Sequence, residues 1–167
     1  VLLAFSGGLD TSFCAMYLAK EKGYEVHTAI ANTGGFSAEE LAIIEEKAYR
    51  LGVKSHKTLD VTKDYYEKSI KYMVFGNVLR NGTYPISVSS ERIFQAIAII
   101  EYAKELGVDY VAHGSTGAGN DQVRFDLTFE ILAPNIKILT PTRDMVLTRE
   151  YEINYLKENG YEADFVK

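Results

Sequence analysis

Short apolar runs alternate with longer, helix-like segments along most of the chain. Val1–Phe5 is apolar throughout, as in a strand buried on both faces. Further strands are expected over residues 24–31, 53–61, 108–112 and 136–139. Helices are expected over residues 13–22, 37–51, 90–106 and 148–159. This alternation predicts an α/β fold, an open doubly wound parallel sheet of about five strands with helices on both faces.

Local signals support the helices. Ser37-Ala38-Glu39-Glu40 has the form of a capping box, and Leu41, Ile44, Ala48 and Leu51 follow at spacings of three and four. The helix over residues 90–106 is nearly all apolar from Ile93 to Ala103, interrupted only by Gln95 and Glu101, so it is expected to be mostly buried. A weak internal repeat places one glycine after each helix: Gly23, Gly52, Gly107 and Gly160.

The chain shows no linker, so residues 1–167 are interpreted as one domain. After Gly160 a strand-like start is followed by no further element. This indicates either a frayed tail or a chain cut before a following domain.

Composition excludes several classes of protein. The net charge of −5 disfavours a general nucleic-acid binder, and no apolar run is long enough to span a membrane. The single cysteine, Cys14, excludes an intramolecular disulfide and a multi-cysteine zinc site, and it is consistent with a reducing cytoplasm. Cys14 lies in an apolar helix and is interpreted as a packing residue. Tyr65, Tyr66 and Tyr72 are expected on a helix and in the core.

The first candidate site is Ser6-Gly7-Gly8-Leu9-Asp10-Thr11-Ser12, between the first strand and the first helix. Two glycines let the backbone turn tightly, and free N–H groups at a helix start favour an anion. Ser6, Thr11 and Ser12 add hydroxyl groups, which suits a phosphate or pyrophosphate. Asp10 has two open interpretations: it complements the helix dipole, or it holds a Mg²⁺ that bridges phosphate oxygens. The alternative for the whole segment is a turn with an ordinary helix cap.

The second candidate site is the stretch from His113 to Phe125, which follows another predicted strand. In a doubly wound sheet this loop and the first one face the same crevice. Asp121 with Arg124 three residues later suits a zwitterion, since a carboxylate pairs with guanidinium and an ammonium with carboxylate. The alternative is a surface loop with a helix cap at Asn120 or Asp121. His113 is expected to orient the loop rather than transfer a proton.

The first stretch resembles the pyrophosphate loop of the N-type ATP pyrophosphatases, which have a Rossmann-like, adenine nucleotide alpha hydrolase-like fold. The second resembles the His-Gly-x-Thr-Gly-x-Gly-Asn-Asp-Gln-Val-Arg-Phe signature of the argininosuccinate synthases. The resemblance implies an ATP-dependent ligase of arginine biosynthesis that condenses citrulline and aspartate, through citrullyl-AMP, with release of AMP and pyrophosphate. It implies ATP and Mg²⁺, a cytoplasmic homotetramer when full-length, and a C-terminal synthetase domain that is absent from this chain.

The resemblance also implies binding residues. Those expected to bind ATP are Ala4, Phe5, Ser6, Gly7, Gly8, Leu9, Asp10, Thr11, Ser12, Ala31 and Gly114. Those expected to bind citrulline are Tyr84, Ser89, Asn120 and Arg124. Those expected to bind aspartate are Thr116, Asn120 and Asp121. No catalytic residue and no resident metal ligand is assigned.

The sequence departs from the family pattern in two places. Ala118 stands where the family often has Lys, and residues 84–93 keep register only at Tyr84, Ser89 and Arg92. Two other hypotheses are kept. One is an ATP pyrophosphatase that adenylates another substrate, and the other is a non-catalytic adenine-nucleotide sensor. Cys14 as the single cysteine argues against a thiolating enzyme, and a sensor has no need for the Asn120, Asp121 and Arg124 set.

Overall fold

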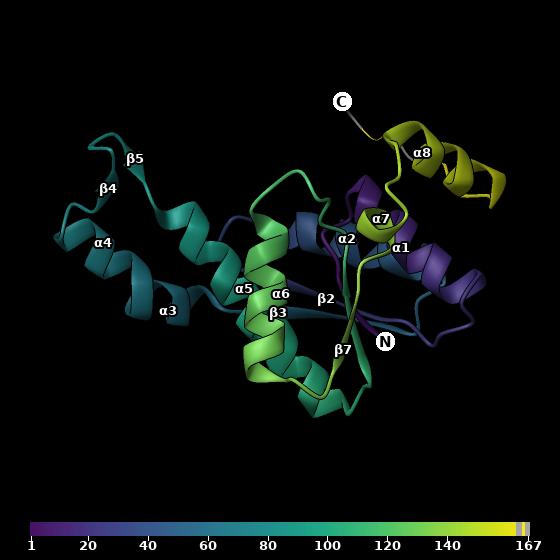
Figure 1. Ribbon diagram of the computed structural model, residues 1–167, viewed down its shortest axis with the longest axis horizontal. Coiled ribbons are helices and arrows are strands. Elements are labelled where there is room, and N and C mark those ends of the chain that lie inside the picture. The colour runs from purple at the N-terminus through teal and green to yellow at the C-terminus, as the bar shows by residue number, and fades with distance from the viewer. Residues whose placement is uncertain (163–164, 166–167) are drawn as a thin grey trace.

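Five parallel strands form the central sheet of the computed structural model, which describes residues 1–162 and residue 165 (Figure 1). They are β1 (Leu2–Ala4), β2 (His27–Asn32), β3 (Ser55–Asp60), β6 (Tyr110–His113) and β7 (Lys137–Leu139). Their order across the sheet is β3-β2-β1-β6-β7. The chain proceeds from the centre to one edge and then from the centre to the other, so the strand order reverses beside β1. The predicted doubly wound α/β sheet is confirmed.

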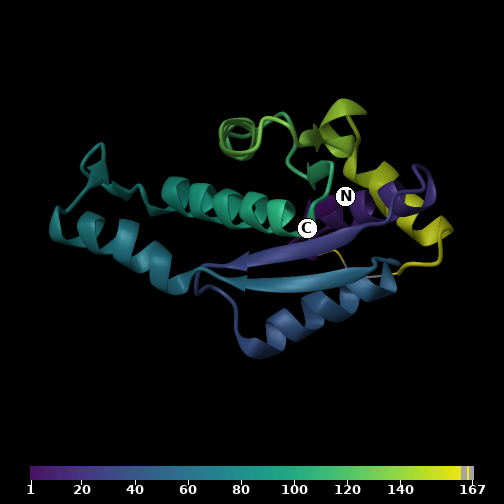
Figure 2. The ribbon, with the colours of Figure 1, turned by 90° about the horizontal axis from the view of Figure 1, so that it is seen from below.

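Helices cover both faces of the sheet. On one face, α1 (Leu9–Lys20), α2 (Ala38–Arg50) and α8 (Arg149–Glu158) share a core with Leu3. On the other face, α5 (Ser87–Leu106) and α6 (Asp121–Leu132) share a core with Leu2. Successive residues of a strand point to opposite faces, which explains why these neighbours belong to different cores. Figure 2 shows α2 and α5 on opposite sides of β2 and β3.

Most predicted helix signals are confirmed. Ser37 and Glu40 form the expected capping box at the start of α2. The glycines after the helices all adopt left-handed φ values of 65°, 84°, 66° and 80°. α1 begins at Leu9, four residues before the expected Phe13, because the polar Asp10-Thr11-Ser12 segment is its first turn. In α5 only Ala96, Ile99, Ile100 and Ala103 are fully buried, so the expectation of a mostly buried helix is only partly met.

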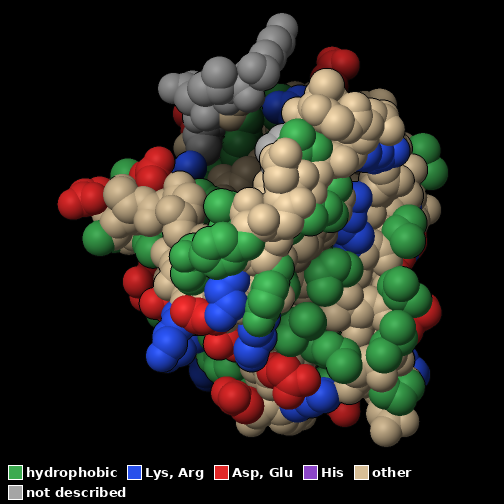
Figure 3. Space-filling model, turned by 90° about the vertical axis from the view of Figure 1, so that its left-hand side faces the viewer, with side chains coloured by type: hydrophobic (Ala, Val, Ile, Leu, Met, Phe, Trp, Pro, Cys, Tyr) green, Lys and Arg blue, Asp and Glu red, His purple; other side chains and the backbone are tan. Residues whose placement is uncertain are grey.

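An arm projects from the sheet beyond β3, at the left of Figure 1. It contains α3 (Thr62–Tyr65), the π-helix η1 (Tyr66–Ile70), α4 (Lys71–Phe75), and the antiparallel pair β4 (Leu79–Arg80) and β5 (Tyr84–Pro85). Tyr65 is buried as expected, but the core interpretation of Tyr66 and Tyr72 is wrong, since both are more than half exposed. The arm is too thin to enclose them. Figure 3 views this end of the molecule and shows hydrophobic side chains among charged ones.

The last elements are α7 (Pro141–Asp144) and α8, which packs against α1. The strand-like start expected after Gly160 falls partly on residues 163–164 and 166–167, outside the described residues, and Tyr161 and Glu162 form no strand. Cys14 is fully buried, and burial raises the pKa of its thiol to about 12, which supports a packing role. Among the described residues, no helix has the length and apolar content needed to cross a bilayer.

Candidate functional site

A cavity of about 710 Å³ opens where β1 and β6 end. The loop after β1 contributes Ser6, Asp10 and Thr11 to its lining, and the loop after β6 contributes Gly114 and Thr116. β1 and β6 are neighbours in the sheet, and the strand order reverses between them. Parallel α/β sheets bind ligands at this kind of position, outside the carboxyl ends of strands at a reversal. The expectation that the two loops face one crevice is confirmed.

The first loop turns sharply at Gly7. Its φ is +74°, in the region that favours glycine, and a Cβ there would lie 3.2 Å from Ile44 Cγ1. Gly8 is the N-cap of α1 with φ −79°, and no side chain in the described part of the chain caps the helix. The first backbone N–H groups of a helix have no intrahelical partner, and here no cap competes for them. The start of α1 therefore offers N–H donors and the positive end of the helix dipole to an anion.

Hydroxyl groups surround this helix start. Ser6 Oγ and Thr11 Oγ1 lie 3.4 Å apart, and the Thr11 hydroxyl donates to the Gly8 carbonyl at 3.2 Å. Ser12 is fully buried, and within the described part of the chain its Oγ has no hydrogen-bond partner. Ser6 and Thr11 line the cavity, whereas Ser12 and the buried Leu9 lie behind it.

Asp10 lines the cavity from the first turn of α1 and contacts Glu152 of α8 behind the loop. Only 1% of Glu152 is exposed, and its Oε1 accepts a hydrogen bond from Thr142 Oγ1 at 3.1 Å. Burial, together with the hydrogen bond and charge of Asp10, raises the pKa of Glu152 to about 7. Below about pH 7 this carboxyl therefore holds a proton that it can donate to Asp10. No sequence signal marks Glu152, because its burial depends on the packing of α8 against α1.

The second loop is pressed against the start of α1. A Cβ on Gly114 would lie 3.1 Å from the backbone carbon of Asp10 and the backbone nitrogen of Thr11, so any side chain there would force the two loops apart by a few tenths of an ångström. His113 is 2% exposed; its Nδ1 accepts from the Ser115 N–H at 3.2 Å, and its Nε2 lies 2.8 Å from Asp126 Oδ1. Burial lowers the pKa of His113, which keeps the ring neutral, with Nε2 as the donor. These contacts support the expected role of His113 in orienting the loop.

Asp126 links the second loop to α7. Burial would raise the pKa of Asp126, but hydrogen bonds from His113 and Arg143 outweigh it and the pKa is lowered. Arg143 also donates to Gln122 Oε1 at 3.0 Å, while Gln122 Nε2 donates to the Gly117 carbonyl at 2.8 Å. The loop is thus held at both ends by side chains of α6 and α7.

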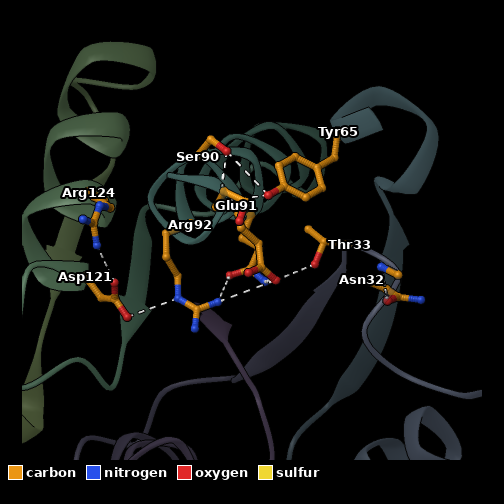
Figure 4. A network of polar contacts seen from close by, with 11 residues as sticks. Asn32, Thr33, Tyr65, Ser90, Glu91, Arg92, Asp121 and Arg124 are labelled. Carbon is orange, nitrogen blue, oxygen red and sulfur yellow. Dashed lines mark hydrogen bonds and ion pairs between the residues drawn. The ribbon is translucent and has the colours of Figure 1, made fainter. Parts of the chain in front are cut away.

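The far end of the cavity is built on Asp121. Its Oδ1 accepts from Arg124 at 2.8 Å, and its Oδ2 accepts from Arg92 Nε at 3.1 Å, so the carboxylate lies between two guanidinium groups (Figure 4). Arg124 also donates to Ser89 Oγ at 3.0 Å. Both charges suited to an amino acid are present: Asp121 for an ammonium group and Arg124 for a carboxylate.

Most residues expected at the site line this cavity. They are Ala4, Phe5, Ser6, Asp10, Thr11, Ala31, Gly114, Thr116, Asn120, Asp121 and Arg124. Gly7, Gly8, Leu9, Ser12, Ser89 and Tyr84 are not among its lining residues. Ser89 reaches the site through Arg124, whereas Tyr84 lies on the arm and is 52% exposed.

Sequence reasoning missed the face of α5 that lines the cavity with Glu91, Arg92 and Gln95. The sequence did offer one indication. Gln95 interrupts an apolar helix, and it follows Arg92 by three residues and Glu91 by four, so the three side chains share one helix face.

Among the described residues, no group of three or more His, Cys, Asp or Glu side chains could hold a metal ion. Asp10 with the hydroxyls of Ser6 and Thr11 forms a sparse oxygen set beside the helix start. Such a set fits Mg²⁺ that arrives with phosphate oxygens and keeps several waters, rather than a cage built by the protein.

Comparison with known proteins agrees with this geometry. Residues 1–162 match the family model described as the argininosuccinate synthase N-terminal HUP domain. The argininosuccinate synthase of Xanthomonas campestris is 46% identical over 165 residues, covering 96% of this chain and 41% of that protein. That of Methanocaldococcus jannaschii is 43% identical over 159 residues, covering 95% of this chain and 40% of that protein. The chain thus spans about two fifths of the length of these relatives.

A solved structure supports the fold alone. A predicted subunit of tRNA methyltransferase from Methanocaldococcus jannaschii has a TM-score of 0.57 at 20% identity, covering 96% of this chain and 88% of that chain. Such low identity says nothing of shared activity. The sequence match over residues 1–162 is decisive, and the chain belongs to the argininosuccinate synthase family, in the region of its N-terminal HUP domain.

Proposed function

We propose that this chain is the ATP-binding part of an enzyme that joins citrulline and aspartate into argininosuccinate, with release of AMP and pyrophosphate. One observation carries the proposal. A single cavity contains an uncapped helix start at one end and the Asp121–Arg124 pair at the other. An anion site beside a zwitterion site is what adenylation of an amino acid requires.

The nucleotide occupies the half of the cavity next to β1 and β2. Its phosphates accept hydrogen bonds from the N–H groups at the start of α1 and from the hydroxyls of Ser6 and Thr11. The walls around Ala31 and Phe36 are apolar and suit the flat base. Asp10 with the hydroxyls of Ser6 and Thr11 would hold a Mg²⁺ bound with ATP, which would supply positive charge to the phosphates.

The amino acids occupy the half next to α6. Thr116, Asn120 and Asp121 hold aspartate, with the Asp121 carboxylate on its ammonium group, and Asn120 and Arg124 hold citrulline. The ureido oxygen of citrulline attacks the α-phosphorus and pyrophosphate leaves. The aspartate amine then attacks the ureido carbon, the C–O bond breaks, and AMP leaves with that oxygen. The chain contributes orientation and charge to both steps.

This chain provides only part of the citrulline site. Tyr84 is exposed on the arm, and Ser89 is engaged by Arg124. We propose that the remaining part of the full-length protein completes the site. The matched region covers 40% of the Methanocaldococcus jannaschii relative, so that relative is about two and a half times as long.

The test uses the protein encoded by the complete reading frame. It is incubated with ATP, Mg²⁺, citrulline and aspartate, and argininosuccinate and pyrophosphate are measured together. We expect both products in equal amounts only when both amino acids are present. A matched control is Lys104→Gln on α5, which removes an exposed cation outside the site and leaves the rate unchanged. No argininosuccinate from the folded wild-type protein would overturn the proposal.

A further inference from the structure

A chain of polar contacts connects the two ends of the cavity, from Thr33 after β2 to Asp121 at the start of α6. Thr33, just past the end of β2, donates from Oγ1 to Glu91 Oε1 at 2.6 Å, and Gln95 Nε2 donates to the same oxygen at 3.3 Å. Arg92 donates from NH1 to Gln95 Oε1 at 2.9 Å. Figure 4 shows this chain running from Thr33 across the start of α5 to Asp121.

Arg92 is held by Asp121 and by Gln95. It binds one carboxylate oxygen of Asp121, and Arg124 binds the other. Its Nε donates to Asp121 Oδ2, while Arg124 donates to Oδ1 through Nη1 and to Ser89 Oγ through Nη2. A guanidinium and a carboxylate ordinarily prefer two parallel hydrogen bonds. With Arg92 on Oδ2, Arg124 makes one hydrogen bond to Asp121 instead of two.

We propose that Arg92 is a positioning residue for aspartate binding: it fixes the Asp121 carboxylate and limits its contact with Arg124 to one oxygen, so that the two groups serve two different ligands. A carboxylate has about four acceptor sites, so Asp121 retains sites for a substrate ammonium group while both arginines are in place. The inference rests on the proposed function, because it takes Asp121 to be the residue that receives aspartate.

The environment of Arg92 fits a fixed rather than a mobile cation. Its side chain is one-third exposed, and the neighbouring Glu91 carboxylate lies 3.9 Å from its NH1. Glu91 is itself held by Thr33 and Gln95, so the start of α5 is tied to the end of β2. Lysine cannot replace Arg92 fully, because one ammonium group cannot match the separate directions in which Arg92 meets Asp121 and Gln95.

The experiment measures KM for aspartate, citrulline and ATP in the complete protein. We expect Arg92→Gln to raise the KM for aspartate about tenfold, as expected for loss of one charge-assisted contact. The KM for ATP stays within about twofold, which also reports that the variant is folded. Arg92→Lys recovers part of the loss. Gln95→Leu raises the same KM by a smaller factor, and Lys104→Gln on the same helix changes none.

A double-mutant comparison separates positioning from direct contact. If Arg92 acts through Asp121, Arg92→Gln has no further effect on the KM for aspartate in an Asp121→Ala background. The same factor in both backgrounds would overturn the inference, and so would an unchanged KM in the single variant. Failure of the proposed function is a different result, because the wild-type protein would then form no argininosuccinate.

Discussion

Glu152 provides the sharpest stability prediction. It is almost fully buried against Asp10 and Thr142, and its pKa is raised from 4.5 to about 7. The folded state therefore binds a proton between these two pH values that the unfolded chain has released. Stability contributed by this proton is fully present below pH 4.5 and is lost as the pH rises through about 7.

The magnitude follows from the size of the shift. At about 1.4 kcal/mol per pKa unit, a shift from 4.5 to about 7 corresponds to about 3.5 kcal/mol at most. Asp10 is partly open to the cavity, where water screens its charge, so we expect about 1–2 kcal/mol. Glutamine has the shape of the protonated carboxyl, since it accepts from Thr142 and donates to Asp10 without titrating. Glu152→Gln is therefore the clean perturbation.

The assay is urea unfolding of the purified chain at pH 5 and pH 8, for wild type and for Glu152→Gln. We expect equal free energies of unfolding at pH 5 and a variant more stable by about 1–2 kcal/mol at pH 8. Comparing the two proteins at each pH cancels other titrating groups, such as His113. Glu152→Leu is the control, and it should lower stability at pH 5 because Thr142 and Asp10 lose a partner. A difference between wild type and Glu152→Gln that does not vary with pH would refute the reasoning.

Three further outcomes test the site. Gly114→Ala should weaken ATP binding by about tenfold in titration calorimetry, because its Cβ pushes the second loop off the start of α1, whereas Gly117→Ala, with open space around it, should not. In the complete protein, Asp121→Ala should raise the KM for aspartate and Arg124→Ala that for citrulline, each by about 10- to 150-fold, and equal effects on both substrates would contradict the assignment. The isolated chain should fold and bind ATP but make no argininosuccinate at a useful rate, because the citrulline site that we propose is only partly built by its residues; turnover near that of the complete protein would show otherwise.

The sheet was predictable because its signals are local. Buried parallel strands require continuous apolar runs, and helices that end in the left-handed conformation favour glycine, as at Gly52 and Gly107. The sequence of the arm predicts its structure less well. Tyr66 and Tyr72 look like core residues in sequence, but their burial depends on neighbours that the arm does not provide.

The two glycine loops of the site were also predictable, since both directly follow strands. The contribution of α5 was not, because Glu91 and Arg92 meet the cavity only once α5 lies across the sheet. Glu152 shows the same limit. Within α8 it resembles any exposed acidic residue, and only the packing of α8 on α1 makes it a buried, protonated neighbour of Asp10.

If the cavity joins an activated citrulline to aspartate through an AMP intermediate, as we propose, the ureido oxygen of citrulline leaves with AMP. The most direct measurement follows the ureido oxygen. The complete protein is supplied with ATP, Mg²⁺, aspartate and citrulline that has a heavy oxygen isotope in its ureido group. The masses of the products are then measured by mass spectrometry. We expect the heavy oxygen to appear in the phosphate of AMP, one atom for each argininosuccinate formed. Argininosuccinate formed alongside unlabelled AMP would contradict it.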